Sequence, residues 1–156
     1  MNIVNARVDE RLIHGQVAMV WTNTIKADRI VVVNDEIIGD EMQIAALKIA
    51  KPAGVKLSLL SKERALIRLS DNSYDGQNIF LITKTVADMV FLAKNLNLKS
   101  INIGNVAAKD GSRSIKKSVS LTEAEISQLQ DLVNDGIIVT AQMLPTETDS
   151  LITTMF

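Results

Sequence analysis

Cysteine is absent from the sequence, and histidine occurs once, at His14. Without cysteine the chain forms no disulfide and offers no thiolate to a metal or a substrate. Zinc sites need several Cys or His ligands, so a single histidine argues against them as well. No apolar run approaches the roughly 18 residues that cross a bilayer, and the first residues lack the apolar core of a signal peptide. We therefore expect a cytoplasmic protein that holds no metal.

An excess of one charge and glycine-rich phosphate loops are also missing. The net charge is -1, and the lysines and arginines are scattered, which gives no support for binding to nucleic acid. Neither G-x-G-x-x-G nor G-x-x-x-x-G-K-[ST] occurs, so neither ATP nor a dinucleotide is indicated. The G-x-S-x-G elbow of serine hydrolases is absent too. The sequence therefore predicts no cofactor.

Runs rich in Val and Ile alternate along the chain with segments of helical spacing. Strands are predicted at residues 2–8, 29–34, 55–60, 78–83, 100–104 and 136–143. Helices are predicted at residues 15–25, 40–50, 62–70, 85–97 and 122–134. Strands that are apolar almost throughout are typical of parallel sheets, whose right-handed crossovers place helices on both faces. We predict one α/β domain, residues 1–156, with a mainly parallel open sheet of about six to seven strands.

The last predicted helix has clear end signals. Thr122 and Glu125 form a capping-box pattern, and Gly136 can take the left-handed conformation that ends a helix. Residues 108–121 fit neither the helical nor the strand period, and their Gly, Ser and Lys content predicts a loop with room for a short edge strand.

His14 lies in the stretch VDERLIHGQV, residues 8–17, just after the first predicted strand. Ligands of open α/β sheets bind beyond the carboxyl ends of the strands. His14 is therefore expected at this rim of the sheet, near the amino end of the following helix, together with residues 34–36, 83–85 and 104–113. A neutral imidazole at such a place can attack phosphorus and hold the phosphoryl group as a phosphoramidate.

The neighbours of His14 suit a phosphoryl group. Asp9 is expected to hold one ring N–H of His14, and Arg11 to clamp the oxygens that are transferred. If Asp9 only orients the ring, its replacement by Asn should slow phosphorylation and leave the unfolding midpoint unchanged. The amino end of the helix adds backbone amides aimed at the anion, those of Gly15, Gln16 and Val17. Glycine at position 15 also allows close approach of the backbone.

The same residues have plainer interpretations. A lone histidine in a loop is most often a surface residue, Asp9 can cap the turn before the helix, and Arg11 can lie in solvent. Trp21 is expected to be buried against the sheet. A regulatory module that binds a phosphorylated small ligand without turnover is a second hypothesis, and a nucleotide-binding domain of doubly wound type is a weaker third one.

The stretch RVDERLIHGQV, residues 7–17, resembles the phosphorylation-site segment of the mannose/fructose/sorbose family of IIB components in the bacterial phosphoenolpyruvate-dependent sugar phosphotransferase system. Its Arg, Asp, Arg, His, Gly and Gln residues all fall at the family's spacing. The resemblance extends through VVVNDEIIGD, INIGNVAAKDGSRSIKKSVSLTEAE and DGIIVTAQMLPTE, and so covers most of the chain. It implies that His14 is the phosphorylated residue, Arg11 the phosphoryl-stabilising arginine and Asp9 the associated aspartate. It assigns no role to Asn34, Asp35, Lys84 or Asn105.

The resemblance also implies an α/β fold with a mainly parallel sheet, and a phosphoryl relay. In that relay a separate IIA protein donates to His14, which becomes a phosphohistidine and passes the group to a sugar delivered by the membrane components IIC and IID. The protein would then be a cytoplasmic sugar phosphotransferase at the periphery of a membrane transporter, with neither metal nor nucleotide. The sugar stays open among mannose, fructose, sorbose and amino sugars such as N-acetylgalactosamine, and so does self-association.

Overall fold

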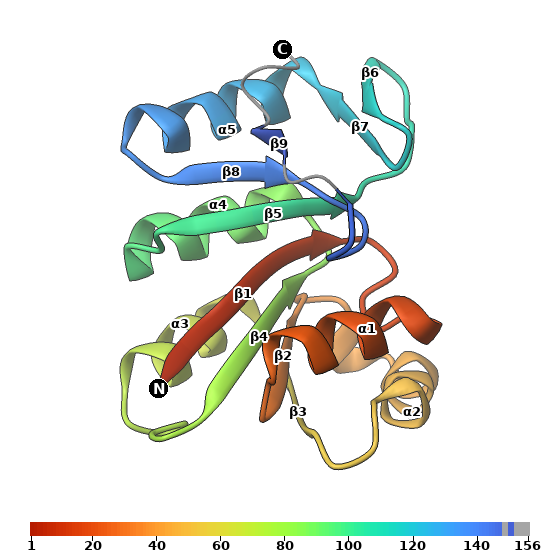
Figure 1. Cartoon of the computed structure of the whole chain (residues 1–156), viewed down its shortest axis with the longest axis vertical. Coiled ribbons are helices and arrows are strands. Elements are labelled where there is room, and N and C mark those ends of the chain that lie inside the picture. The colour runs from red at the N-terminus through yellow and green to blue at the C-terminus, as the bar shows by residue number, and fades with distance from the viewer. Residues whose placement is uncertain (148–149, 152–156) are drawn as a thin grey trace.

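The main sheet contains seven strands in the order β3-β2-β4-β1-β5-β8-β9 in the computed structural model, which describes residues 1–147 and 150–151 (Figure 1). All neighbouring strands pair in parallel except β9, which runs antiparallel to β8. The strands of this sheet are β1 (Asn2–Asp9), β2 (Arg29–Val33), β3 (Lys56–Leu60), β4 (Asn78–Thr83), β5 (Ser100–Asn105), β8 (Ile138–Ala141) and β9 (Ser150–Leu151). The predicted α/β class with a mainly parallel sheet is confirmed.

Helices cover both faces of this sheet, as the right-handed crossovers require. One face carries α1 (Gly15–Ile25) and α2 (Glu41–Ala50), with the short 3-10 helix η1 (Ile37–Gly39) before α2 (Figure 1). The other face carries α3 (Lys62–Ser70), α4 (Val86–Leu96) and α5 (Glu123–Asn134). Within the described residues, no helix combines the length and the apolar character needed to cross a membrane.

Residues 30–33 of strand β2 are all apolar because the strand lies between two helical layers. Ile30 and Val32 belong to the core that Trp21 of α1 and Leu47 of α2 complete, whereas Val31 and Val33 belong to the core on the side of α3, α4 and α5. These four residues of β2 are fully buried. Successive side chains of a strand point to opposite faces, so a strand between two helical layers needs apolar residues at every position.

Strand β1 lies inside the sheet, between β4 and β5, with Val8 opposite both Thr83 and Ile103. Strands β2, β3 and β4 lie to one side of β1, and β5, β8 and β9 lie to the other. The chain leaves the sheet at Asp9 and returns as α1, so the loop that carries His14 begins where the two halves of the sheet meet. Such a change in the direction of strand order is the usual ligand-binding place in open α/β sheets.

Three details of the fold differ from the prediction. Residues 108–121 contain a hairpin, β6 (Ser112–Lys116) with β7 (Val119–Thr122), which forms its own antiparallel sheet and not an edge of the main one. Strand β8 is shorter than the predicted 136–143, and β9 was not predicted. The end signals of α5 are confirmed, because the Thr122–Glu125 capping box forms and Gly136 has a φ of 89°.

Candidate functional site

His14 is the N-cap residue of α1, with an exposed side chain. Its carbonyl oxygen accepts from the amide of Ala18 (3.4 Å), while its imidazole makes no capping hydrogen bond. Gly15 follows with a φ of 47°, in the left-handed region that favours glycine. A Cβ atom at Gly15 would contact nothing within 4 Å, so the turn, and not crowding by the protein, accounts for glycine here. The ring is thereby presented to solvent at a helix amino end.

The first amides of α1 are free to bind an anion. The backbone N–H groups of Gly15, Gln16 and Val17 donate to no acceptor in the described part of the chain, and Ala18 is the first to bond back to the preceding turn. Unpaired amides at the start of a helix point outward and, with the helix dipole, favour negative charge. The structure therefore places all three predicted phosphoryl-binding residues beside His14.

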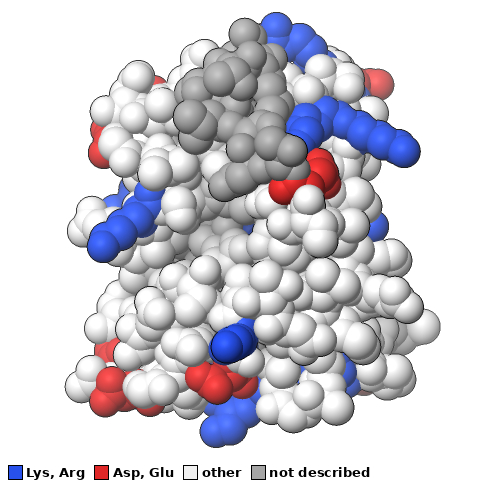
Figure 2. Space-filling view, in the orientation of Figure 1, with Lys and Arg blue, Asp and Glu red and all other residues white. Residues whose placement is uncertain are grey.

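A hollow of about 290 Å³ opens next to His14. One wall is the loop from Glu10 to Gly15, and the other wall is α2, which contributes Gln43, Ala46, Leu47 and Ala50. We did not anticipate α2 in the site, because its sequence is that of an ordinary amphipathic helix. Figure 2 shows charged groups scattered over one face of the molecule, with a largely uncharged area over α1.

Asp9 lies below this loop, 1% exposed, and its carboxylate is bound by two arginines. Oδ2 accepts from Nη2 of Arg7 (3.2 Å), and Oδ1 accepts from the backbone N–H (2.9 Å) and Nε (3.3 Å) of Arg11. Among the described residues it forms no hydrogen bond with His14, so the expected bond to the ring is not formed. The expectation that Asp9 matters for rate alone has to be revised, because a buried ion pair also affects folding.

Arg11 reaches from Asp9 toward the surface. Its side chain is 28% exposed, lines the hollow and donates to Asp9 through Nε and, at 3.5 Å, through Nη2. The carboxylate therefore holds one edge of the guanidinium group. Nη1 has no partner in the part of the chain that the structure describes, which leaves a donor for an anion in the hollow.

Glu10 ties the His14 loop to the segment after β5. Its backbone N–H donates to the carbonyl of Asn105 (3.0 Å), and its Oε2 accepts from the amide of Ala107 (3.1 Å). The expected convergence of residues 104–113 on this rim therefore holds for Asn105 and Ala107. Asn105 contributes its backbone carbonyl to this link.

Residues 34–36 follow β2, and residues 83–85 lie at the end of the neighbouring strand β4 on the same rim, but both segments form turns of their own. Asn34 Oδ1 accepts from the amides of Glu36 (3.2 Å) and Ile37 (3.0 Å), which shapes the turn into η1. Asp35 Oδ1 accepts from the amide of Lys62 at the start of α3 (2.8 Å). Lys84 is outside the set of residues that line the hollow beside His14. The contacts of Asn34 and Asp35 are those of turn and helix-start residues.

Arg7 belongs to the stretch that resembles the family, but sequence reasoning gave it no role in the site. Its side chain is 1% exposed, its Nη1 donates to the carbonyl of Gln142 (2.7 Å), and its Nη2 donates to that of Met143 (3.0 Å) as well as to Asp9. Its Cζ lies 5.2 Å from the centroid of the Trp21 ring. Burial lowers the pKa of Arg7, and the charge of Asp9 acts in the opposite direction. An arginine in the buried second half of β1, two residues before Asp9, was the available signal.

The segment after β8 is held against the site by several contacts. Trp21 Nε1 donates to the carbonyl of Met143 (2.8 Å), and Asn102 Nδ2 donates to that of Gln142 (2.9 Å). Lys116 Nζ forms an ion pair with Glu147 (2.9 Å), whose other carboxylate oxygen accepts from the amide of Met143 (3.0 Å). The expected burial of Trp21 is confirmed.

The Lys116–Glu147 pair should make stability depend on pH. The hydrogen bond from Lys116, with those from the Met143 and Leu144 amides, lowers the pKa of Glu147 from its ordinary 4.5. The stabilisation that the ionised Glu147 carboxylate contributes is thus fully present above pH 4.5. It is lost as the pH falls through the lowered pKa of the folded state. We expect Glu147→Gln to reduce stability at neutral pH by less than about 1 kcal/mol, because the pair is partly exposed.

The check is a thermal unfolding series of Glu147→Gln against the wild type from neutral pH to about pH 3. The difference in Tm should shrink toward the acid end. Glu36→Gln is the matched control, since Glu36 is exposed. A difference that stays constant over the whole range would contradict the assignment.

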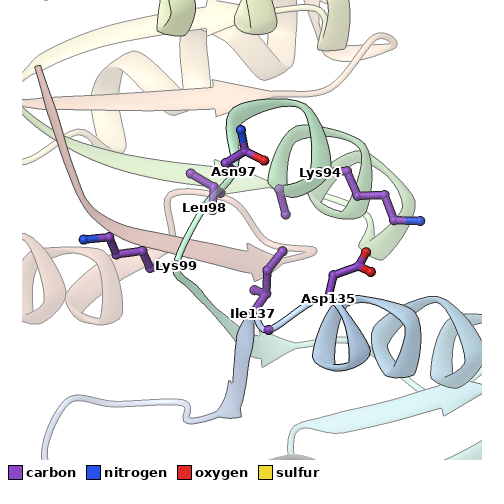
Figure 3. Close-up of a pocket in the computed structure, with 8 residues that line it drawn as sticks. Lys94, Asn97, Leu98, Lys99, Asp135 and Ile137 are labelled. Carbon is purple, nitrogen blue, oxygen red and sulfur yellow. The ribbon is translucent and has the colours of Figure 1, made fainter.

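A larger hollow of about 450 Å³ lies at the opposite end of the strands, between the end of α4 and the start of β8 (Figure 3). Its lining includes Lys94, Asn97, Lys99 and Asp135. The two lysine side chains extend in different directions, and neither points at a shared centre (Figure 3). The chemistry of the His14 loop has no counterpart in this hollow.

Comparison with known proteins identifies the family. The family model "PTS system sorbose subfamily IIB component" matches residues 3–156. The fructose-specific EIIB component of Bacillus subtilis is 34% identical over 148 residues, which cover 94% of this chain and 91% of that protein. The mannose-specific EIIAB component of Escherichia coli is 29% identical over 143 residues, 91% of this chain and 44% of that protein. The crystal structure of the IIBSor domain of the Klebsiella pneumoniae sorbose permease superposes with a TM-score of 0.94 at 29% identity, covering 99% and 96% of the two chains. The chain therefore belongs to the sorbose subfamily of IIB components of the sugar phosphotransferase system.

Proposed function

We propose that His14 accepts a phosphoryl group from a phosphorylated IIA protein and transfers it to a sugar during uptake through the membrane components IIC and IID. One observation carries the proposal: the chain has one histidine and no cysteine, and that histidine is exposed at the amino end of α1 beside Arg11. Histidine and cysteine both form covalent intermediates as nucleophiles. In a chain without cysteine, the imidazole is the acceptor that this site offers.

The proposed transfer is an in-line displacement through a loose transition state. The lone pair of an imidazole nitrogen forms the N–P bond while the bond between phosphorus and the donor breaks, and the donor keeps that electron pair. In the second step a sugar hydroxyl oxygen attacks phosphorus, the N–P bond breaks, and the hydroxyl proton is released. Arg11 and the first amides of α1 stabilise the charge on the transferred oxygens.

The partners in this proposal follow from the same site. The E. coli relative carries an A and a B component under one name, EIIAB, and this chain matches 44% of its length. We infer that a separate IIA protein docks over the hollow between the His14 loop and α2, and that the protein works in the cytoplasm beside its membrane transporter. The names of the three relatives contain fructose, mannose and sorbose, so the proposal specifies no sugar.

The test is covalent labelling of the wild-type protein. The protein is incubated with phosphoenolpyruvate, the general phosphotransferase proteins and a IIA donor, and its intact mass is measured. We expect the added mass of one phosphoryl group, lost on brief acidification and retained in base, as a phosphoramidate requires. A label that survives acid, or one that base removes, would place the group on another residue type. A chain that stays unlabelled with several IIA donors would favour the binding-module hypothesis.

Arg11→Lys should slow the transfer although the positive charge is kept. Lysine lacks the planar guanidinium group, which can donate to Asp9 and to a phosphoryl oxygen at the same time. We expect a loss of roughly tenfold or more in the transfer rate, or about 1.4 kcal/mol of transition-state stabilisation. Rapid-quench measurement of label transfer from phospho-IIA tests this. Arg113→Lys is the matched control, because Arg113 is exposed on β6. Equal rates for Arg11→Lys and the wild type would show that a point charge suffices.

A further inference from the structure

Arg7 occupies a position from which it cannot act on a phosphoryl group directly. Its side chain is 1% exposed, beneath the loop that carries the exposed His14. It nevertheless contacts Asp9, the Trp21 ring and the carbonyl groups of Gln142 and Met143. These partners come from β1, from α1 and from the segment after β8. A charged group with partners in three elements holds those elements in one relative arrangement.

We propose that Arg7 is a positioning residue for phosphoryl transfer and acts on Arg11 through Asp9. Arg7 holds Oδ2 of Asp9 at 3.2 Å, and Arg11 is held by Oδ1 of the same carboxylate at 2.9 Å and 3.3 Å. Because the carboxylate is planar, the hydrogen bond from Arg7 to Oδ2 also fixes the orientation in which Oδ1 faces Arg11. This role rests on the proposed function, in which Arg11 stabilises the transferred group.

Gly104 on β5 leaves the space that Arg7 fills. A Cβ atom at Gly104 would overlap the Cζ, Nη1 and Nη2 atoms of Arg7. Gly104 does not have a positive φ, so its backbone does not demand glycine, and the need for space is the reason for it. Replacing Gly104 with Ala therefore displaces the Arg7 guanidinium group while every charged residue of the site is kept.

The experiment compares Arg7→Lys, Gly104→Ala and their double variant with the wild type. Phosphoryl transfer from phospho-IIA is measured as kcat and KM, with Gly39→Ala as the matched control, because a Cβ atom at Gly39 meets open space. We expect each single variant to lower kcat by about tenfold to a hundredfold with KM changed by less than about twofold. Gly39→Ala should match the wild type.

The double variant tests the shared route. If both changes act by displacing the same guanidinium group, Gly104→Ala adds little to the loss that Arg7→Lys already causes. Trp21, the one tryptophan of the chain, reports the displacement independently. Its fluorescence should change in Arg7→Lys and Gly104→Ala, which remove or shift the cation over its ring, and stay unchanged in Gly39→Ala.

The outcomes separate this role from the proposed function. A wild type that takes no acid-labile label overturns the function and the positioning role together. A labelled wild type with a Gly104→Ala variant of wild-type kcat overturns the positioning role alone. A raised KM at unchanged kcat also overturns the positioning role, since Arg7 would then shape only the docking surface. Fully multiplicative losses of kcat in the double variant overturn it as well. Should Gly104→Ala fail to fold, kcat and KM of Arg7→Lys decide.

Discussion

Replacing His14 with Gln is expected to abolish phosphorylation by phospho-IIA. Glutamine keeps a polar side chain at the amino end of α1 but offers no comparable nucleophile, and the chain contains no second histidine and no cysteine to replace it. Intact mass after incubation with the donor system should therefore equal that of the untreated variant. A His14→Gln protein that is labelled as fully as the wild type would remove His14 from the relay.

The same variant should fold normally. His14 is exposed, and its side chain makes no capping hydrogen bond to α1, so the substitution breaks no contact that holds the loop. We expect the free energy of unfolding to stay within about 0.5 kcal/mol of the wild type, as for other exposed positions. Asn23→Gln, at an exposed position on α1, is the control and should keep both stability and full labelling.

Replacing Asp9 with Asn should cost both stability and rate. Asp9 and Arg7 have side chains exposed by 2% and 1%, so the pair is shielded from solvent, and removing one charge leaves the other buried without its partner. Losing one partner of a buried pair typically costs about 3–5 kcal/mol. Arg11 also loses the carboxylate that orients it, so phosphoryl transfer should slow as well.

Urea unfolding of Asp9→Asn and single-turnover transfer at a temperature where the variant is folded measure the two effects separately. Asp40→Asn provides the matched control. Asp40 caps α2 by accepting from the amide of Gln43, and Asn caps a helix about as well, so a change of a few tenths of a kcal/mol at most is expected. An Asp9→Asn protein as stable as the wild type would show that Arg7 does not depend on this carboxylate.

Local signals in the sequence account for most of the fold. The β4 run NIFLIT is apolar almost throughout, and its predicted and observed bounds agree because such a run fits a strand buried on both faces. Ser61 caps α3 and Thr122 caps α5, and both lie at predicted helix starts. Strand β8 ends at Ala141 although a strand is predicted to residue 143, because the carbonyl groups of Gln142 and Met143 turn to Arg7, Asn102 and Trp21.

The β6–β7 hairpin and strand β9 were not predicted from the sequence, for a physical reason. In β6 the consecutive residues Arg113 and Ser114 are both exposed, so the strand lacks the alternation that marks a half-buried strand. Strand β9 has two residues, which is too short for any period. Strand β6 forms by pairing with β7, and β9 forms by pairing with β8, and neither depends on a strong strand preference of its own residues.

The position of the His14 loop could be predicted because its residues are neighbours in sequence. The loop from Asp9 to His14 and the free amides of α1 follow from one strand end and one helix start. Arg7 was missed because two of its partners, Gln142 and Met143, lie 135 and 136 residues further along the chain. The wall contributed by α2 was missed for the same reason, since only packing brings Gln43 beside His14.

The position of β1 inside the sheet has a consequence for biosynthesis. Strand β1 leaves the ribosome before both of its neighbours, because β4 and β5 end at Thr83 and Asn105, and the carbonyl groups that accept from Arg7 follow at Gln142 and Met143. Pairings of such long sequence separation form late in folding, because loop closure comes before their contacts stabilise the chain. A nascent chain that ends before Gln142 offers Arg7 the Asp9 carboxylate but neither of its two carbonyl acceptors, so the contacts of Arg7 beneath the His14 loop are completed only after residue 143 has been made.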